Sequence, residues 1–419
     1  MQRMRKMNGN KALLMLLMLV LLVGCNRMLP ENDEINKIPN DGDDLTNEEV
    51  REEPIDPIEE ILSKLSMDEK IGQLIIAGFE GTELNDEVVK LVDEYKVGGF
   101  ILFSRNILDE NQTIKLLNDI KDLNSKNNIP LFLSIDEEGG RVSRLPKSYV
   151  KLPEAAVFGK KNNKALSYEL GKILGERVKA LGFNMNFSPV LDINSNPKNP
   201  VIGNRAFGSN VETVVENGIE AMLGIKETNV ISVVKHFPGH GDTSIDSHVN
   251  LPMVDKTKDE LKSFELVPFI NAIENDADAI MIAHILYPKI DSNPATMSSK
   301  IIDDLLRNEL GFNGIVISDD MTMGAIVENY TLEEAVLSFL KGGGDIALIC
   351  HGYENILKAV ESIKEAVRTG ELPEEKINEK VYRILSIKEK YNLKDEPIED
   401  IDLTDINNRT LELINKVKN

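Results

Sequence analysis

Eight short apolar runs alternate with amphipathic segments through most of this 419-residue chain. The runs are residues 71–79, 97–103, 131–135, 184–191, 231–234, 279–284, 314–318 and 345–350. Apolar runs of this length are typical of parallel strands buried on both faces. The intervening segments contain helix start signals, such as the capping boxes that begin at Ser66 and Thr331. Eight strands with intervening helices favour an α/β fold, the (β/α)8 barrel, over the alternative of an open doubly wound sheet.

The amino-terminal region differs from the predicted barrel. Four basic residues among the first eleven precede an apolar stretch at residues 12–23, which is short for a bilayer span and typical of a signal-peptide core. The stretch ends in Leu-Val-Gly-Cys at residues 22–25, which closely resembles a bacterial lipobox. We therefore expect a lipoprotein signal peptide over residues 1–24, lipidation of Cys25, and a lipid-anchored location on the extracytoplasmic face of the cell membrane. The alternative is an uncleaved anchor with an incidental cysteine.

Residues 25–57 are acidic, contain four prolines and are rich in Asn, Asp and Glu. Such a segment cannot bury enough apolar surface to fold, so we expect a solvated tether between lipid and domain. The predicted barrel then occupies residues 58–396, and residues 397–419 follow it as a C-terminal tail.

The charge and the cysteines narrow the classes of partner. A net charge of −22 argues against binding of nucleic acid or anionic lipid through the domain surface. It does not exclude an anionic substrate, because Arg141, Arg144, Arg205 and Lys235 are candidates for a locally basic pocket. The only cysteine after Cys25 is Cys350, which lies in an apolar run where a buried, inert thiol is expected.

Three of the five histidines lie in one segment, Lys-His-Phe-Pro-Gly-His-Gly-Asp-Thr-Ser-Ile-Asp-Ser-His, at residues 235–248. Lys235 and His236 should lie at the carboxyl end of the strand 231–234, and the glycines and proline after them predict a loop. Asp246 and His248 are two apart, and in extended backbone such side chains point to the same side. A hydrogen bond between them would fix the imidazole tautomer and raise its proton affinity, as a general acid near neutral pH requires.

A metal site is the alternative interpretation of this segment. His236 and His240 are four apart, and Asp242, Asp246 and His248 lie nearby. The glycines and the proline prevent the helix on which such a histidine pair would share one face, so the metal site ranks second. We expect neither a metal nor a cofactor.

Other polar residues also follow the apolar runs, at the carboxyl ends of strands where a barrel gathers its reactive groups. They are residues 104–106 after the second run, 136–144 after the third, Asp192 and 203–207 after the fourth, His284 after the sixth, and Asp319 and Asp320 after the seventh. Such a pocket suits glycoside hydrolysis, in which a retaining enzyme needs a nucleophilic carboxylate and a nearby acid. Asp319 is the predicted nucleophile because it ends an apolar strand, and His248 is the predicted acid.

The chain strongly resembles family 3 glycoside hydrolases, specifically the β-N-acetylhexosaminidase branch that acts on bacterial cell-wall sugars. The resemblance covers residues 58–393, the whole predicted barrel. It is carried by five motifs, at residues 99–106, 136–144, 203–207, 235–248 and 318–321. The β-glucosidase branch shares the Lys-His pair but lacks the Asp-Ser-His loop, so this loop favours an N-acetylglucosaminidase. Some Gram-positive relatives carry a second α/β domain after the barrel, and we expect that domain to be absent here.

The resemblance implies a role for particular residues. It makes Asp319 the nucleophile, His248 the acid/base and Asp246 its dyad partner. The contacts with the substrate sugar fall to Asp136, Arg144, Arg205, Lys235 and His236. Glu137 departs from the glutamine that the family pattern places beside Asp136.

The sequence therefore predicts a retaining β-N-acetylglucosaminidase that acts through a covalent glycosyl-enzyme. Its partner would be a carbohydrate, the terminal β-linked N-acetylglucosamine of peptidoglycan-derived or related oligosaccharides, and we expect a membrane-anchored monomer. Two alternatives stay open: a sugar-binding surface lipoprotein that has lost turnover, and a family 3 β-glycosidase for another sugar. The identity of the aglycone and the use of phosphate in place of water also stay open.

Overall fold

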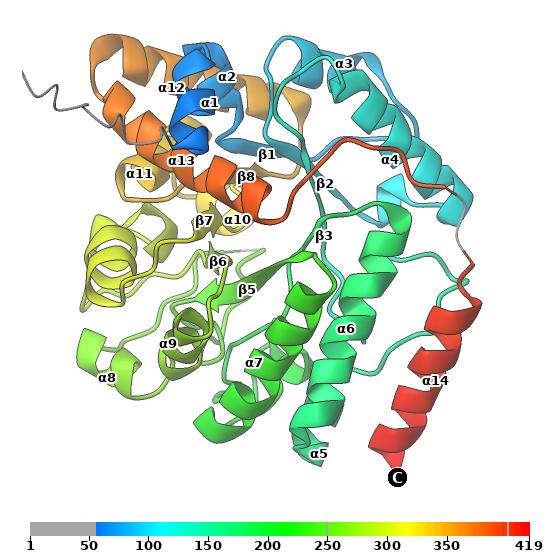
Figure 1. Cartoon of the computed structure of the whole chain (residues 1–419). Helices are drawn as coiled ribbons and strands as arrows, with labels where there is room; N and C mark the ends of the chain where they lie inside the picture. Colours follow the sequence, from blue (N-terminus) through cyan, green and yellow to red (C-terminus); the bar gives the residue numbers. More distant parts are fainter. Residues whose placement is uncertain (1–55, 249, 400–401) are drawn as a thin grey trace, which may run out of the picture. The chain divides into compact units, whose positions relative to one another are not determined.

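The computed structural model describes residues 56–248, 250–399 and 402–419. Its eight strands are β1 (Ile75–Ala77), β2 (Gly99–Leu102), β3 (Phe132–Ile135), β4 (Met185–Asn186), β5 (Ile231–Phe237), β6 (Ala279–Ile282), β7 (Ile315–Ser318) and β8 (Ala347–Ile349). They pair in parallel in the order β7-β6-β5-β4-β3-β2-β1-β8. A parallel bridge between Ile317 and Ile346 joins the two ends of this sheet, so the barrel is closed (Figure 1). The predicted (β/α)8 barrel is confirmed, and the open sheet is excluded.

Seven strands lie within their predicted runs, and the eighth, β5, begins in its run and extends beyond it. β5 continues to Phe237 with all seven residues buried. Lys235 and His236 therefore lie within the strand and not just after its end, which corrects the predicted boundary. Its register with β6 shifts between Val234 and Phe237.

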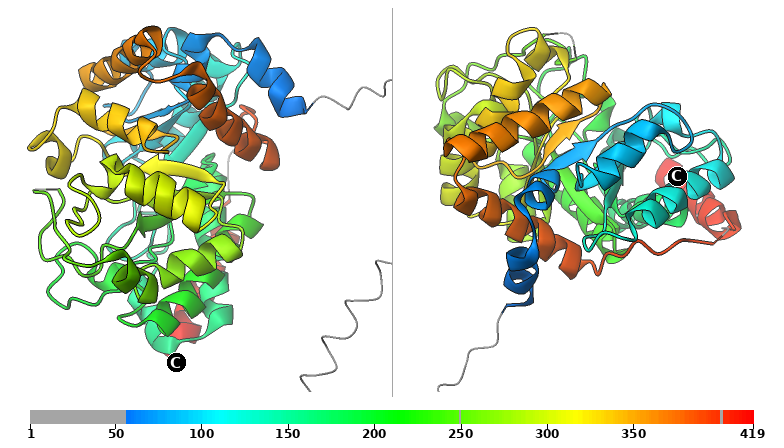
Figure 2. Two further views of the ribbon diagram at one scale, coloured as in Figure 1. Left: turned by 90° about the vertical axis from the view of Figure 1, so that its left-hand side faces the viewer. Right: turned by 90° about the horizontal axis from the view of Figure 1, so that it is seen from above.

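Helices surround the strands in all three views (Figures 1 and 2). They are α1 (Pro57–Lys64), α2 (Met67–Gly72), α3 (Asp86–Asp93), α4 (Glu110–Asn124), α5 (Ala155–Lys161), α6 (Lys164–Leu181), α7 (Val211–Glu227), α8 (Lys258–Ser263), α9 (Val267–Glu274), α10 (Gly324–Val327), α11 (Leu332–Lys341), α12 (Tyr353–Thr369), α13 (Glu374–Lys390) and α14 (Thr404–Lys418). Short 3₁₀-helices, η1 (Ser104–Asn106), η2 (Gly203–Arg205) and η3 (Ala295–Met297), and the ten-residue π-helix η4 (Lys300–Glu309) lie in the connections. The predicted capping box at Ser66 is complete, whereas Thr331 makes only the bond from the Glu334 amide.

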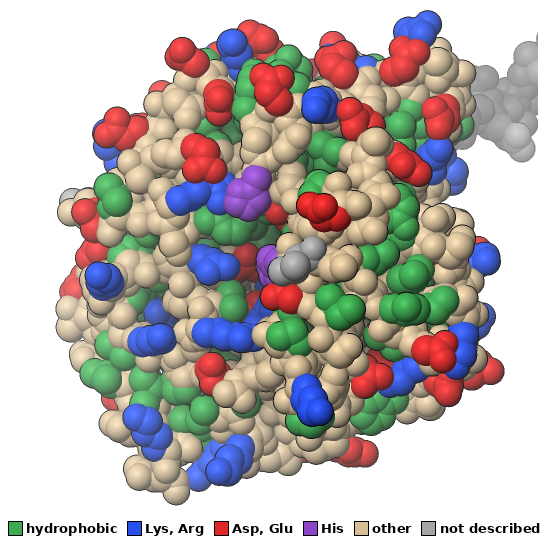
Figure 3. All heavy atoms as spheres, turned by 180° about the vertical axis from the view of Figure 1, so that it is seen from behind, with side chains coloured by type: hydrophobic (Ala, Val, Ile, Leu, Met, Phe, Trp, Pro, Cys, Tyr) green, Lys and Arg blue, Asp and Glu red, His purple; other side chains and the backbone are tan. Residues whose placement is uncertain are grey.

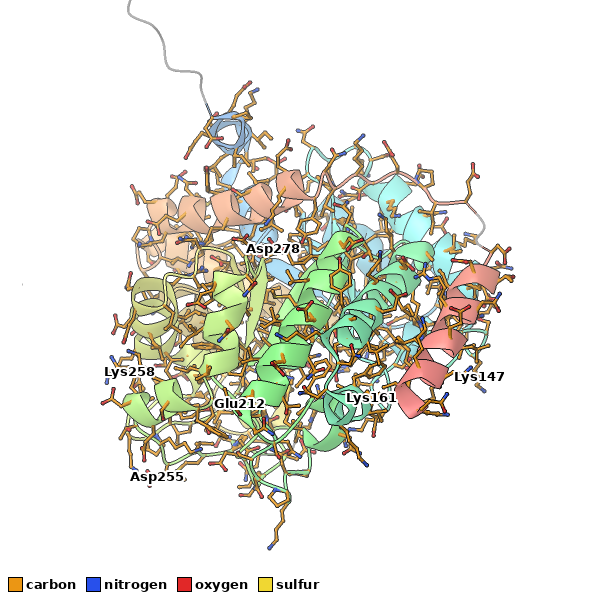
Figure 4. All side chains as sticks on the ribbon, turned by 60° about the horizontal axis from the view of Figure 1, so that its bottom comes forward. Lys147, Lys161, Glu212, Asp255, Lys258 and Asp278 are labelled. Carbon is orange, nitrogen blue, oxygen red and sulfur yellow. The ribbon has the colours of Figure 1, made fainter. Side chains whose placement is uncertain are left out.

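A buried carboxylate at the end of the barrel that holds the strand N-termini pairs with the end of α13. Asp278, labelled in Figure 4, directly precedes β6 and is 2 % exposed. Its two carboxylate oxygens accept hydrogen bonds of 2.5 Å from Lys390 Nζ and the Tyr391 hydroxyl, at the end of α13. This contact joins α13 to the end of the barrel opposite the site.

The described residues begin slightly before the predicted domain start at residue 58. Asp56 caps α1 by accepting a hydrogen bond from the Ile58 amide, and the Tyr382 hydroxyl on α13 also donates to it at 2.7 Å. The signal peptide, Cys25 and most of the predicted tether lie outside the described residues. Within the described part of the chain, no helix combines the length and apolar character that a bilayer crossing requires.

The predicted C-terminal tail contains a packed helix. α14 lies against α6, and its Thr410, Leu413 and Val417 are buried (Figure 1). Asn407 on α14 accepts a hydrogen bond from the Val150 amide at 2.9 Å and donates to the Ser148 carbonyl at 3.0 Å. The helix therefore contacts the long connection between β3 and α5.

Candidate active site

A cavity of about 200 Å³ lies at the carboxyl ends of the strands. Pockets for drug-sized ligands measure roughly 300–1,000 Å³, so this cavity suits a single small ring. It is lined by Ile101, Phe103, Asp136, Val142, Arg144, Val201, Arg205, Lys235, His236, His240, Ser247, His248, Met281, Asp319, Asp320, Met323, Leu348, Cys350 and His351. All the residues predicted to act in catalysis or to contact the sugar, except Asp246, are among them. Figure 3 shows this hollow, with histidine side chains beside it and Lys and Arg side chains along one border.

Asp319 is fixed immediately after β7. Its amide donates to the Ile282 carbonyl at 2.9 Å, and its carboxylate accepts the Asp320 amide at 2.9 Å. Burial acts to raise the pKa of Asp319, but the nearby His284 and His236 outweigh it, so the pKa lies below its usual value. The carboxylate is therefore ionised at neutral pH, as a nucleophile must be.

Asp246 and His248 form the predicted hydrogen bond, but on a turn and not on extended backbone. One oxygen of Asp246 accepts both the His248 amide at 2.9 Å and the ring Nδ1 at 2.8 Å. Burial acts to raise the pKa of Asp246, but these two bonds lower it below its usual value. The side chain of His248 is 66 % exposed, so the ring lies at the solvent edge of the cavity, where a leaving group would depart.

Four charged groups form one network on the floor of the cavity. Lys235 Nζ lies 2.7 Å from both Asp136 Oδ1 and Glu138 Oε1. Arg205 donates two bonds to Glu138, at 2.7 and 2.8 Å. Burial acts to lower the pKa of Lys235, but the two carboxylates raise it above its usual value. The network holds Asp136 and Lys235 in fixed positions.

A hydrogen bond with Asp192 fixes the ring of His236. Its Nδ1 lies 2.6 Å from Asp192 Oδ2, and Asp192 Oδ1 accepts the His240 amide at 2.6 Å. If Nδ1 donates to Asp192, Nε2 is left as an acceptor, 3.4 Å from an Arg205 nitrogen. Asp192 is completely buried and positions His236, so it does not face the cavity itself.

Arg144 and Glu137 have different roles. Arg144 lines the cavity, and its buried Nε has no hydrogen-bond partner within the described residues, so it is free to donate to a substrate oxygen. Glu137 lies beneath the same loop, where its carboxylate accepts the Arg144 amide at 3.1 Å and lies 3.7 Å from Arg177. Glu137, which stands where the family pattern has glutamine, therefore supports the loop backbone and does not line the cavity.

Several site residues were not predicted. The sequence placed Glu138 and Asp192 at strand ends but did not assign their partners: Glu138 bonds Arg205 and Lys235, and Asp192 bonds His236. His351 lines the cavity directly after β8, and its ring stacks on Phe103 with centroids 5.8 Å apart. Its position after the eighth apolar run was the signal that could have identified it. Arg141, a candidate for a basic pocket, instead donates to the carbonyls of residues 201 and 202.

The described parts of the chain do not support the alternative interpretation as a metal site. Among these residues, no group of three or more His, Cys, Asp and Glu side chains is placed to hold an ion. His236 contacts Asp192, and His240 contacts the hydroxyls of Thr243 and Ser247. Cys350 is a buried free thiol whose pKa burial raises well above its usual value, as expected for an inert cysteine.

Cleavage of a glycosidic bond requires a group that stabilises or attacks the anomeric carbon and a group that gives a proton to the departing oxygen. The ionised Asp319 and the oriented His248 meet these needs at one small cavity. The barrel and its site therefore define a glycoside hydrolase. Residues 66–387 match the family model described as "Glycosyl hydrolase family 3 N terminal domain", and the chain belongs to this family.

Known proteins of the family are similar over most of the barrel. The structure of a glycoside hydrolase family 3 β-N-acetylglucosaminidase from Paenibacillus sp. str. FPU-7 superposes with a TM-score of 0.80 at 38 % identity, covering 84 % of this chain and 69 % of that one. The β-hexosaminidase of Methylobacillus flagellatus is 34 % identical over 70 % of this chain and 84 % of its own length. β-Hexosaminidase A of Pseudoalteromonas piscicida is 34 % identical over 74 % of this chain, which spans only 56 % of that protein. The chain is thus a glycoside hydrolase within the β-N-acetylhexosaminidase group of the family.

Proposed function

We propose that this chain is a retaining β-N-acetylglucosaminidase that removes terminal β-linked N-acetylglucosamine from peptidoglycan-derived or related oligosaccharides. The observation that carries the proposal is the hydrogen-bonded Asp246–His248 pair at the edge of a cavity that contains the ionised Asp319. The names of the relatives, a β-N-acetylglucosaminidase and two β-hexosaminidases, support the choice of sugar.

In the first step, a carboxylate oxygen of Asp319 attacks the anomeric carbon. The bond from that carbon to the leaving oxygen breaks, and its electron pair stays on the leaving oxygen. His248 gives this oxygen the proton of Nε2, while Asp246 accepts from Nδ1 and stabilises the ring before the transfer. The products are the free aglycone and a glycosyl ester on Asp319.

In the second step, a water molecule attacks the same carbon. His248 now acts as a base and takes a proton from the water, and Asp319 leaves as a carboxylate. Two displacements at one carbon retain the configuration of the released sugar. Both groups return to their starting protonation states.

The remaining charged groups would hold the sugar ring. Asp136 and Lys235 offer one acceptor and one donor, each fixed by the charge network on the cavity floor. Arg144 contributes the free Nε donor, and His236 is oriented by Asp192. Positions fixed before binding reduce the entropy cost of orienting the substrate.

We also propose a location. Lipidation of Cys25 would attach the chain to the extracytoplasmic face of the membrane, with residues up to the first helix as a tether. Cell-wall fragments are β-linked N-acetylglucosamine glycans found on that side of the membrane. This location is the reason for proposing peptidoglycan fragments over other glycans.

A substrate panel tests the proposed function. We expect the purified chain to hydrolyse p-nitrophenyl N-acetyl-β-glucosaminide far faster than p-nitrophenyl β-glucoside, and to release N-acetylglucosamine from peptidoglycan fragments. Repeating the assay with added phosphate shows whether the product is the free sugar or the sugar phosphate. Binding of N-acetylglucosamine without any turnover would contradict the proposal and favour the sugar-binding lipoprotein.

A further inference from the structure

Ser247 lies between the two dyad residues and differs from both in its surroundings. It is 2 % exposed, whereas the side chains of Asp246 and His248 are 40 % and 66 % exposed. Its hydroxyl lies 3.1 Å from His240 Nε2, and its carbonyl accepts the Ala325 amide at 3.1 Å. Ser247 is therefore fixed to the barrel on two sides while its neighbours reach into solvent.

His240 provides a rigid partner for this serine. It is 1 % exposed, and its amide donates to Asp192 at 2.6 Å. If Thr243 donates its one hydroxyl proton to the His240 carbonyl, Nδ1 is the donor in its 2.9 Å contact with the Thr243 oxygen. Nε2 is then left as an acceptor, and the hydroxyl of Ser247 donates to it.

These bonds connect three parts of the site. Asp192 binds His236 on β5 through one oxygen and the His240 amide through the other. His240 binds Ser247, and the carbonyl of Ser247 binds Ala325 in the short helix α10, which follows the nucleophile segment. A continuous path of hydrogen bonds thus runs from the sugar-facing strand, through the dyad loop, to the segment after Asp319.

The dyad pair alone cannot fix the loop on the barrel. Among the described residues, the side-chain hydrogen bonds of Asp246 and His248 go only to each other and to the His248 amide. They set the ring relative to Asp246 and leave the position of the pair relative to the cavity undetermined. A group that contacts both the loop and the barrel can set that position. Asn196 and Asn199 bond the loop at Thr243, three residues before the dyad, whereas Ser247 bonds the barrel between the two dyad residues.

We infer that Ser247 and His240 act as a latch: positioning residues that hold the Asp246–His248 dyad over the cavity. This inference rests on the proposed function, because it assigns the latch to proton transfer by His248. Loss of the latch would leave the fold and the nucleophile in place. It would reduce the fraction of time in which the ring reaches the leaving oxygen.

The test compares Ser247→Ala with Ser244→Ala in the full chain. Ser244 is an exposed serine of the same loop whose side chain has no hydrogen-bond partner in the described residues, so it is a matched control. Each variant is assayed on an N-acetylglucosamine disaccharide, which needs a proton on its leaving oxygen, and on a nitrophenyl glycoside, which needs little help. We expect Ser247→Ala to lose about 3- to 10-fold in kcat on the disaccharide. Its kcat on the nitrophenyl glycoside should change much less, and Ser244→Ala should match the wild type on both.

A double-mutant cycle shows whether Ser247 acts through His248. In a His248→Ala variant the proton donor that the latch positions is already absent. Adding Ser247→Ala should therefore cause no further loss of activity on the disaccharide. Equal losses on the two substrates, or an undiminished loss in the His248→Ala background, would overturn the inference.

Hydrogen exchange gives a readout that does not depend on turnover. Peptides covering residues 241–250 should exchange faster in Ser247→Ala than in Ser244→Ala or the wild type, because the loop opens more often. Unchanged exchange would overturn the latch even in an active enzyme. A wild type with slow loop exchange but no N-acetylglucosaminidase activity would instead contradict the proposed function.

Discussion

At the scale of single residues, the proposed chemistry depends on one carboxylate. Asp319 carries a pKa below its usual value because His284 and His236 outweigh its burial. Asp319→Asn keeps the shape but removes the nucleophile, so we expect turnover of a nitrophenyl glycoside to fall by roughly 1,000-fold or more. Circular dichroism should be unchanged, because the residue ends a strand and lies outside the apolar core.

Trapping identifies the nucleophile directly. A slow fluorosugar substrate should accumulate as an ester on Asp319, and mass spectrometry of the peptides would locate it. Asp320 is the nearest alternative, but its carboxylate already accepts the Cys350 amide at 3.0 Å and the Thr322 hydroxyl at 2.7 Å. A label on Asp320 or Asp192 would show that the assignment is wrong.

His248 should reveal its role through the leaving group. A nitrophenolate departs without a proton, whereas a sugar alkoxide does not, so His248→Ala should lose roughly 10- to 1,000-fold more activity on a disaccharide than on a nitrophenyl glycoside. Asp246→Asn should act in the same direction more weakly, since it removes the orienting group and leaves the ring. The ratio of kcat/KM for the two substrates measures the effect. Equal losses on both would assign His248 to binding or loop structure.

The sequence predicted the cavity residues better than it predicted their partners. Strand ends in a barrel share one face, so Asp136, Lys235 and Asp319 could be placed together from the apolar runs alone. The pairing of Asp192 with His236 joins two strand ends that are 44 residues apart. No local pattern encodes which of several nearby acids contacts a given histidine, and this choice needs the three-dimensional register.

At the scale of elements, the apolar runs located all eight strands but not their boundaries: β1 and β4 are much shorter than their runs, and β5 is longer. Lys235 and His236 end the apolar run, yet both are buried in the strand. The charge network and Asp192 compensate their burial, so polarity no longer indicates exposure. The turn at Asp246 was also missed, because a spacing of two fits extended backbone and a side-chain-stabilised turn equally well.

α14 was predicted only as a tail, since an isolated amphipathic stretch does not indicate which surface it will contact. Asn407 bonds the backbone at Ser148 and Val150, in the connection that also carries Arg144. One of these hydrogen bonds is partly buried and the other is exposed, so together they contribute roughly 1–2 kcal/mol, and Asn407→Ala should lower the free energy of unfolding by about that amount. Asn408→Ala, an exposed neighbour on the same helix, is the matched control.

The same variant tests whether the connection positions the sugar site. We expect Asn407→Ala to raise KM for the nitrophenyl glycoside more than it lowers kcat, because the role proposed for Arg144 is to contact the sugar and not the reacting bond. Unchanged KM with reduced stability would limit α14 to a structural role. Equal stability of Asn407→Ala and Asn408→Ala in urea unfolding would contradict the contact itself.

At the scale of the whole molecule, stability should depend on pH through His240. Burial and the nearby His236 lower the pKa of His240 from 6.5 to about 4. Below pH 6.5 the unfolded chain therefore binds a proton that the folded chain does not, and stability falls as pH decreases from about 6.5 to 4. Between pH 7.5 and 5 this amounts to about 2 kcal/mol.

Urea unfolding at both pH values measures this loss, and His240→Gln is the comparison. The variant should be less stable at pH 7.5 but lose less stability on acidification, since it lacks the titrating group. Burial lowers the pKa of Lys388 to about 7. Its contribution to stability is therefore lost as pH decreases from 10.5 to 7, which lies mainly above the interval from pH 7.5 to 5. An equal pH dependence in the wild type and the variant would contradict a buried neutral His240.

The attachment of the molecule to a membrane is the last property that an experiment can isolate. With a net charge of −22, the chain has no electrostatic attraction to anionic lipid, so stable attachment must come from apolar anchoring. If Cys25 is lipidated, the full chain should sediment with membranes and resist a high-salt wash, and Cys25→Ser should abolish lipid labelling. Cys350→Ser is the matched control because it removes the other cysteine, and its membrane fraction should equal that of the wild type.

A variant that begins at residue 54 retains the Asp56 cap of α1 and should be soluble and active, because the cavity is built entirely from later residues. Lipid labelling that persists in Cys25→Ser, or activity that requires residues 1–53, would show that the tethered-lipoprotein proposal is wrong.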